Sequence, residues 1–288
     1  MPIATKPLTG SEFVVEVPGI DLSESQDAET IAALRTALAK HSILVFRQQS
    51  LTNEQQIAFS RNFGELEIHL VRQYLMPKHP EIIVLSNIGA GGVKPTANGG
   101  AYWHSDISYR AKPPLGSLLY GIEVPPEGGN TLFANMYGAY DTLSDDLKHK
   151  IEGRKAVHSY LERFNAMRNI DTSHKGENKF ELDEEQNESF PPVLHPIVRT
   201  HPESGRKALF VNDGFTIGIE DMDEDDGKAL LRELNIHATR EPLVYSHAWQ
   251  PGDLVFWDNR STMHCATSYD PVHTRTMHRT TIQGDTPY

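Results

Sequence analysis

The pair His104 and Asp106, separated by one residue, constrains this chain more than any other feature of its sequence. On an extended strand, side chains alternate between two faces, so both residues would point to the same side. The pair gains meaning from His264, far downstream, which follows an apolar run at residues 254–256 that we interpret as a buried strand. Two imidazoles and one carboxylate form the open ligand set of non-haem Fe(II) oxygenases, whereas a lone His-x-Asp pair is a common structural coincidence.

Two arginines, Arg275 and Arg279, follow His264 in a stretch whose threonines and terminal Ile282 predict a strand. They would share one face of that strand, with Cα atoms about 13 Å apart. Guanidinium groups pair with carboxylates and sulfonates through two parallel hydrogen bonds, so this separation favours two anionic groups over one shared group. The alternative is a pair of surface arginines on a sheet face.

With these features in place, the chain resembles the Fe(II)- and 2-oxoglutarate-dependent dioxygenases typified by taurine dioxygenase and chlorophenoxyacetate dioxygenase. The resemblance covers nearly the whole chain, and the final stretch from His264 to Asp285 matches in spacing as well as in residue type. The other motifs that carry it are 44–47 (LVFR), 55–59 (QQIAF), 63–64 (FG), 103–106 (WHSD), 128–131 (GGNT), 195–196 (HP), 199–202 (RTHP), 205–206 (GR) and 257–260 (WDNR).

The resemblance implies a set of site residues. It assigns His104, Asp106 and His264 to Fe(II), and it implies that 2-oxoglutarate and dioxygen are cosubstrates. Thr131 and Arg275 would hold the distal carboxylate of 2-oxoglutarate. The implied substrate pocket contains Arg279, His69, Phe215, Phe164 and Arg72. Departures from the taurine enzyme at Gly100 and Arg163 put taurine itself in doubt and leave a small anionic substrate expected.

The implied reaction is hydroxylation of a small organic anion, with release of a leaving group where the hydroxylated carbon bears one. Our first expectation is a sulfonate such as taurine or a related alkylsulfonate. The alternative is an aryloxyalkanoate like chlorophenoxyacetate, or another carboxylate, and desaturation or cyclisation stays open. Two remoter alternatives are a zinc hydrolase, because zinc accepts the same ligands, and a jelly-roll binding protein without turnover.

Composition narrows the class further. With 38% hydrophobic and 23% charged residues, the 288-residue chain has the balance of a globular protein with a sizeable core. The formal net charge of −12 argues against a nucleic-acid partner. A single cysteine excludes an intrachain disulfide, and no apolar run approaches the length of a membrane span. We therefore expect a cytoplasmic enzyme without a membrane partner, and a homo-oligomer, either a dimer or a tetramer.

The order of elements predicts a mainly β protein with flanking helices, a double-stranded β-helix or jelly roll, formed as a single domain over residues 1–288. Many short strands alternate with a few helices, and we expect the metal pair on a strand of its own. Mobile loops are expected near 87–101 and 165–190, where glycine or polar residues dominate without periodicity. The predicted helices are 28–40, 52–62 with a Thr52–Gln55 capping box, 139–152 and 224–237; predicted strands include 82–85, 115–124, 131–134, 194–200 and 208–212.

Overall fold

A computed structural model describes residues 3–8, 12–70, 72–96, 100–161 and 191–288. The whole loop expected at 165–190 lies outside these ranges, as do residues 97–99 of the loop expected at 87–101. The described part of that second loop includes a short 3-10 helix, η2 (Ala90–Gly92). Among the described residues, no helix is long and apolar enough to cross a membrane.

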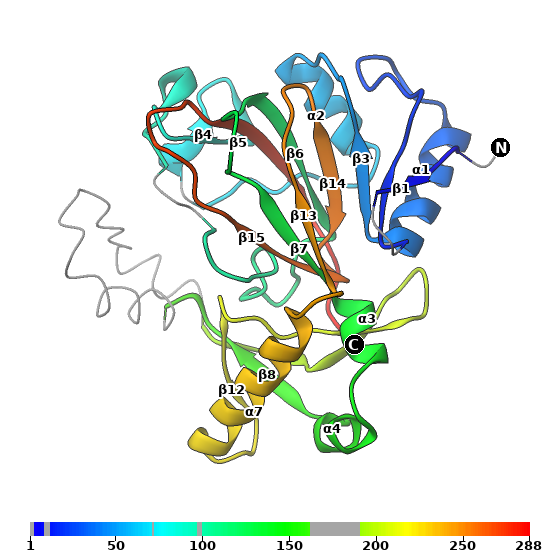
Figure 1. The fold of residues 1–288 in the computed structure, drawn as a ribbon, viewed down its shortest axis with the longest axis vertical. Helices are drawn as coiled ribbons and strands as arrows, with labels where there is room; N and C mark the ends of the chain where they lie inside the picture. The colour runs from blue at the N-terminus through cyan, green and yellow to red at the C-terminus, as the bar shows by residue number, and fades with distance from the viewer. Residues whose placement is uncertain (1–2, 9–11, 71, 97–99, 162–190) are drawn as a thin grey trace.

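The largest sheet has eight strands, and it is antiparallel except where β2 runs parallel to β3. Its strands, in spatial order, are β1 (Lys6–Pro7), β2 (Val14–Glu16), β3 (Ile43–Phe46), β14 (Leu254–Asp258), β6 (Gly116–Glu123), β16 (Thr276–Ile282), β5 (His79–Ser86) and β4 (Leu75–Met76). A second, antiparallel sheet has the order β13 (Val244–His247), β7 (Thr131–Asn135) and β15 (Thr262–Ala266). Figure 1 shows β7, β13 and β15 crossing in front of the larger sheet.

Strand β14 explains why the predicted apolar run is continuous rather than alternating. Leu254 and Phe256 belong to the cluster on the helix-covered side of the large sheet. Val255 and Trp257 belong to a different cluster, which also contains Phe133 from β7 of the second sheet. A strand that is buried on both faces has no polar face to present, so its sequence loses the two-residue alternation. Two packed sheets with helices outside confirm the predicted mainly β architecture.

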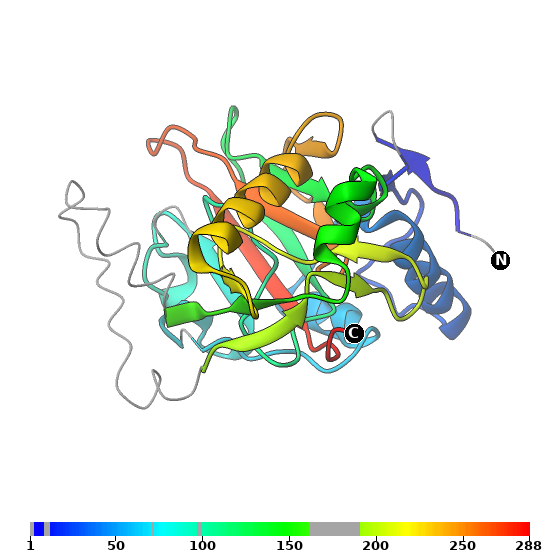
Figure 2. The same ribbon diagram turned by 90° about the horizontal axis from the view of Figure 1, so that it is seen from below.

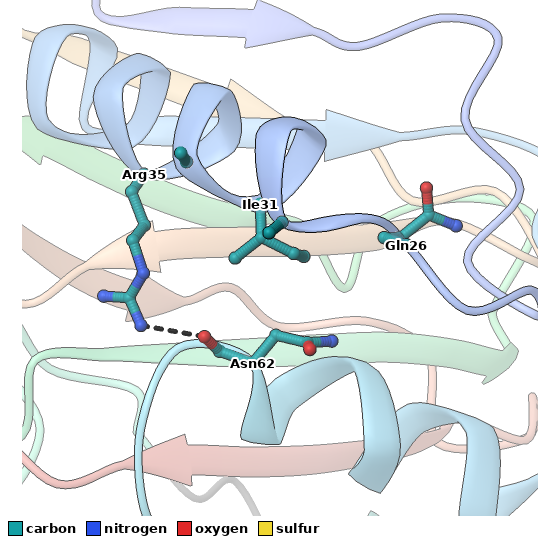
Figure 3. A pocket seen from close by; sticks show the side chains of 6 residues that line it. Gln26, Ile31, Arg35 and Asn62 are labelled. Carbon is teal, nitrogen blue, oxygen red and sulfur yellow. Dashed lines mark hydrogen bonds between the residues drawn. The ribbon is translucent and has the colours of Figure 1, made fainter.

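The helix-covered side carries α1 (Ala28–His41) and α2 (Asn53–Arg61). The predicted capping box is present at the start of α2, where Thr52 accepts from the Gln55 main chain and the Gln55 side chain accepts from Thr52. A groove of about 410 Å³ opens between the two helices, and there Arg35 Nη2 donates to the Asn62 carbonyl at 2.8 Å (Figure 3). None of the groove's lining residues is a candidate site residue.

The remaining elements gather at the opposite end of the molecule, in the lower half of Figure 1, and Figure 2 shows this end from below. They are α3 (Met136–Asp141), α4 (Asp145–Ile151), α7 (Glu224–Ala238) and two small sheets. One sheet is β12 (Thr216–Ile219), β8 (Lys155–His158) and β9 (Val193–Pro196), and the other is β10 (Val198–Thr200) with β11 (Lys207–Leu209). The short η1 (Arg72–Tyr74) is not among these elements, because it lies beside β4 and β5 of the large sheet.

Three predicted elements differ from the structure. The single helix expected at 139–152 is two helices, because Thr142 ends α3 and Ser144 caps α4 by accepting from the Leu147 main chain. The strand expected at 194–200 is split between two sheets, β9 and β10. The strand expected around His104 is a single bridge to His264, after which the chain turns.

Candidate active site

The three predicted metal ligands lie together in the folded chain. His104 and His264 exchange two main-chain hydrogen bonds, of 3.0 and 2.8 Å, which fix the two histidines side by side. Oδ1 of Asp106 lies 4.0 Å from Nε2 of His104 and 3.8 Å from Nε2 of His264. The three side chains are buried, and one potential ligand atom from each lies within 4.8 Å of the other two. The three predicted ligands therefore lie together even though the chain turns after His104 instead of forming the expected strand.

The protonation of the histidines fits a metal ion. Nδ1 of His104 lies 2.8 Å from the Tyr102 carbonyl, which can only accept, so Nδ1 is the donor and Nε2 is the nitrogen that would carry the lone pair of the neutral ring. Burial, together with the nearby His104, lowers the pKa of His264 well below its ordinary value. His264 is therefore neutral, and neutral imidazole is the form that binds a metal. Two imidazoles and a carboxylate suit Fe(II).

The Asp106 carboxylate is held at both oxygens. Ser117 Oγ donates to Oδ2 at 2.7 Å, and Arg279 Nη1 donates to Oδ1 at 2.8 Å. Burial alone would raise the pKa of Asp106. The charge of Arg279, the two histidines and the Ser117 hydrogen bond outweigh burial and hold that pKa well below its usual range. Asp106 is therefore ionised and available as an anionic ligand.

The two arginines reach different neighbours. Strand β16 pairs with β5 without a register shift, which keeps the predicted alternation along the strand that carries Arg279. Arg275 precedes this strand and lies against the Gly128–Gly129 turn, where its Nε donates to the Gly129 carbonyl at 3.3 Å. Burial lowers the pKa of Arg275, and Tyr269 acts against that shift. Arg279 instead contacts Asp106, so the structure separates the two guanidinium groups.

Thr131 begins β7, two residues after the turn that Arg275 contacts. Its buried Oγ1 accepts a 3.0 Å hydrogen bond from Nε1 of Trp249. An indole nitrogen only donates, so the Thr131 hydroxyl keeps its own proton for another acceptor. Thr131 therefore offers an O–H two residues after the glycine whose carbonyl the Arg275 guanidinium contacts.

The predicted pocket residues divide into three groups. His69 lies near the site: burial, together with the charges of Arg279 and Arg110, lowers its pKa to about 3 against the opposing charge of Asp106. Phe215 is buried with its ring centroid 6.2 Å from that of His104. Arg72 is exposed in η1, and among the described residues it contacts none of the other candidates. Phe164 lies outside the described residues.

Three tyrosines that lie with the predicted Phe215 beside the candidate metal ligands were not identified from the sequence. The Tyr102 ring lies 4.7 Å from His104, and Tyr109 lies 4.9 Å from Phe215 and 4.8 Å from Tyr160. Burial raises the pKa of Tyr160 to about 12, so its ring is neutral. Tyr102 and Tyr109 flank His104 and Asp106 in the sequence, and that proximity is the signal from which their role could be inferred.

Comparisons with known proteins agree with this geometry. A sequence profile described as "Taurine catabolism dioxygenase TauD, TfdA family" matches residues 4–281. The chain is 37% identical over 286 residues to the alpha-ketoglutarate-dependent 2,4-dichlorophenoxyacetate dioxygenase of Cupriavidus pinatubonensis, covering 95% of both chains. It is 33% identical over 287 residues to the (S)-phenoxypropionate/alpha-ketoglutarate-dioxygenase of Sphingobium herbicidovorans, covering 95% of this chain and 92% of the relative.

Among solved structures, the crystal structure of AAD-2 in complex with Mn(II) and N-oxalylglycine superposes with a TM-score of 0.82 at 36% identity. The match covers 100% of this chain and 99% of that one. These comparisons confirm the jelly-roll fold and leave no support for the zinc hydrolase or for the binding protein without turnover. The chain belongs to the TauD/TfdA family and is an alpha-ketoglutarate-dependent, non-haem iron dioxygenase.

Proposed function

We propose that this enzyme hydroxylates aryloxyalkanoic acids, which combine a carboxylate with an aromatic ring. The observation that carries the proposal is the neighbourhood of the His104–Asp106 pair: Arg279 contacts Asp106, and an aromatic group surrounds the His104 ring. A guanidinium pairs with a carboxylate, and aromatic side chains pack against an aryl ring. Two relatives whose names state aryloxyalkanoate substrates, at 37% and 33% identity, support the same reading.

In the proposed site, Nε2 of His104, Nε2 of His264 and Oδ1 of Asp106 hold Fe(II). With 2-oxoglutarate and dioxygen, the bound iron supplies the oxidising power that converts a C–H bond to C–OH, while 2-oxoglutarate becomes succinate and CO2. Arg275 and Thr131 bind the distal carboxylate of 2-oxoglutarate, because Arg275 contacts Gly129, Thr131 follows two residues later, and both side chains offer donors. This arrangement places the two anions of the reaction on separate arginines.

In this proposal, the carboxylate at one end of the substrate and the aryl ring at the other end orient it in the site. Arg279 binds the substrate carboxylate, and its Nε is buried without a hydrogen-bond partner among the described residues, so an anion would satisfy it. Phe215 and its tyrosine neighbours contact the ring and keep water away from the reacting carbon. His69 lies near Arg279 and stays neutral. Arg72 and Phe164 stay predicted pocket residues.

Hydroxylation of the carbon that bears the aryloxy group gives a hemiacetal, whose C–O bond to the aryloxy oxygen breaks to give a phenol and a 2-oxo acid. Release of the phenol therefore distinguishes this substrate class from others. The sulfonate reading competes because a guanidinium also binds a sulfonate, and the family description names taurine. An alkylsulfonate, however, makes no use of the aromatic group beside His104.

The test is a substrate panel with purified enzyme, Fe(II), 2-oxoglutarate and air. Aryloxyacetates and aryloxypropionates should stimulate succinate formation and release a phenol in equal amount. Taurine and longer alkylsulfonates should stimulate it much less, and Asp106→Ala should abolish it. Stronger stimulation by taurine than by any aryloxyalkanoate would reject the proposal. The expected homo-oligomer and cytoplasmic location stay predictions from the sequence.

A further inference from the structure

We propose that Ser117 and Asn259 are positioning residues, which together fix the Asp106 carboxylate so that Oδ1 faces the two histidines. The proposal rests on the metal site proposed above and extends it to two residues outside the ligand set. Ser117 lies on β6, and Asn259 lies in the turn between β14 and β15. Both side chains are buried, with exposed fractions of 0% and 1%.

The hydrogen bonds among these residues can be assigned a direction from one donor. Trp257 Nε1 lies 2.9 Å from Oδ1 of Asn259, and an indole nitrogen can only donate. The Asn259 amide is therefore oriented with its oxygen toward Trp257 and its nitrogen toward Ser117. The main-chain N–H of Asp106 also donates to the same oxygen, at 3.4 Å, which supports this orientation.

The orientation of Asn259 determines what the Ser117 hydroxyl does. Nδ2 of Asn259 donates to Ser117 Oγ at 3.3 Å, so the oxygen of that hydroxyl is already used as an acceptor. Its single proton can go to Asp106 Oδ2 at 2.7 Å or to Thr281 Oγ1 at 3.4 Å. The proton therefore goes to the Asp106 carboxylate, which is closer and charged, because hydrogen bonds to ionised groups are stronger. The chain of donors thus runs from Trp257 through Asn259 and Ser117 to Asp106.

This hydrogen-bond chain links the segment that carries His104 and Asp106 with the segment that carries His264. Asn259 precedes β15, which carries His264, and its carbonyl accepts a 2.8 Å hydrogen bond from Ser105, between His104 and Asp106. Because Oδ2 is occupied by Ser117, rotation of the carboxylate would break a buried hydrogen bond. Oδ1 therefore stays toward His104 and His264, and only that oxygen is presented for ligation. Residues that hold a ligand in this way commonly change metal affinity by about 10- to 100-fold when removed.

The experiment measures metal affinity directly, without turnover. Mn(II) is titrated into the apoprotein anaerobically, and free Mn(II) is read by electron paramagnetic resonance. Ser117→Ala should weaken binding by about 10- to 100-fold. The matched control is Ser60→Ala, which removes another buried hydroxyl, bonded to Thr280 and to the Gln56 carbonyl on the other side of the large sheet. Ser60→Ala should retain wild-type affinity, and circular dichroism verifies that each variant is folded.

A second variant tests the hydrogen-bond chain at Asn259, and it replaces Ser117→Ala in the experiment if that variant does not fold. Asn259→Ala removes the amide but leaves the Ser117 hydroxyl, whose proton is then free to turn toward Thr281. It should also weaken Mn(II) binding, and the double variant should lose less than the product of the two single losses, because both act through one hydrogen-bond chain. Substituting Co(II) should give visible absorption bands that differ between wild type and Ser117→Ala.

The outcomes separate this proposal from the metal site itself. If wild-type protein and Ser60→Ala bind Mn(II) tightly and folded Ser117→Ala binds it equally, the positioning role is rejected while the metal site stands. Independent, multiplying losses in the double variant would reject the chain through Asn259. Failure of the wild type to bind Mn(II) would overturn the metal site, and this proposal with it.

Discussion

Arg279 Nη1 donates a 2.8 Å hydrogen bond to Oδ1 of Asp106, the same oxygen that faces the two histidines. The side chain of Arg279 is only 12% exposed, so this ion pair is poorly screened by solvent. A substrate carboxylate bound to this guanidinium would therefore lie next to the proposed metal ligands. If Arg279 binds the substrate as proposed, its position would bring the bound carboxylate beside the reacting centre.

The first prediction concerns Arg279→Ala, which should impair substrate binding and leave 2-oxoglutarate binding intact. Losing a charged hydrogen-bonded anchor costs on the order of 2–4 kcal/mol, so the KM for an aryloxyalkanoate should rise about 30- to 1000-fold. Arg279→Lys should recover only part of this loss, because an ammonium keeps the charge and lacks the planar fork. The measurement is the KM for each of the two organic anions.

A neutral amide analogue of the substrate is the control for this variant. It should bind poorly to the wild type and be penalised much less by Arg279→Ala, because it has no carboxylate to lose. Equal damage to substrate and 2-oxoglutarate binding would show that the two arginines serve one anion.

The second prediction concerns Arg275→Ala, which should raise the apparent 2-oxoglutarate requirement by about 30- to 1000-fold through loss of the same kind of anchor. Thr131→Val should have a smaller effect in the same direction, because it removes one neutral donor. Arg35→Ala serves as the control, since Arg35 lies on α1, donates to the carbonyl of Asn62 in the groove of Figure 3 and packs over the Phe63 ring. An unchanged 2-oxoglutarate requirement in Arg275→Ala would contradict the assignment.

The sequence predicts those parts of the fold that depend on neighbouring residues. The α2 capping box is confirmed because Thr52 and Gln55 interact over three positions. The helix expected at 139–152 is wrong because its apolar spacing continues across a break, and only Ser144, a capping residue inside the pattern, signals that break. Local patterns therefore locate elements better than their ends.

The site shows the complementary limit. The sequence identifies His104, Asp106 and His264 because these residue types bind metals and the spacing of the first two is typical of a metal site. Ser117 is an ordinary serine in an apolar strand, and its contact with Asp106 depends on how β6 packs beside the His104–Asp106 turn. No pattern of period two or 3.6 encodes such a contact. The aromatic neighbours of Phe215 come from separate segments and meet only in the folded chain.

The third prediction concerns Asp258, a fully buried carboxylate that accepts from Arg260 and from His201. Burial opposes its ionisation, but Arg260 and His201 hold its pKa well below the ordinary value of 3.8. A depressed pKa stabilises the folded state fully above that ordinary value, and the contribution is lost as pH falls below it. Asp258→Asn should cost on the order of 3–5 kcal/mol at neutral pH, since it breaks a buried pair.

The measurement for Asp258 is thermal unfolding of wild type and Asp258→Asn between neutral pH and pH values below 3.8. The difference in Tm should be largest at neutral pH and should shrink as the wild-type carboxyl is protonated. Asp141→Asn is the control, because Asp141 is exposed and its pair with Arg206 is solvent-screened. A Tm difference that stays constant down to the acid end of the range would show that the charge of Asp258 does not stabilise the fold.

The last prediction concerns Phe215, whose ring packs against Tyr109 beside His104. If this group contacts the aryl ring of the substrate, Phe215→Leu should keep the site apolar but lose the aromatic contact, which is worth about 0.5–1.5 kcal/mol. The KM for aryloxyacetates should then rise about two- to tenfold, while the 2-oxoglutarate requirement and Mn(II) affinity stay at wild-type values. The smaller side chain should also favour substrates with bulkier ring substituents over the unsubstituted acid. Phe59→Leu is the control: Phe59 packs against Phe46 and Phe63 on the helix-covered side of the large sheet, so it should lower Tm without changing the order of preference among substrates. If Phe215→Leu changes all substrates, including alkylsulfonates, by one common factor, the ring is a packing residue and the aromatic group does not select the substrate.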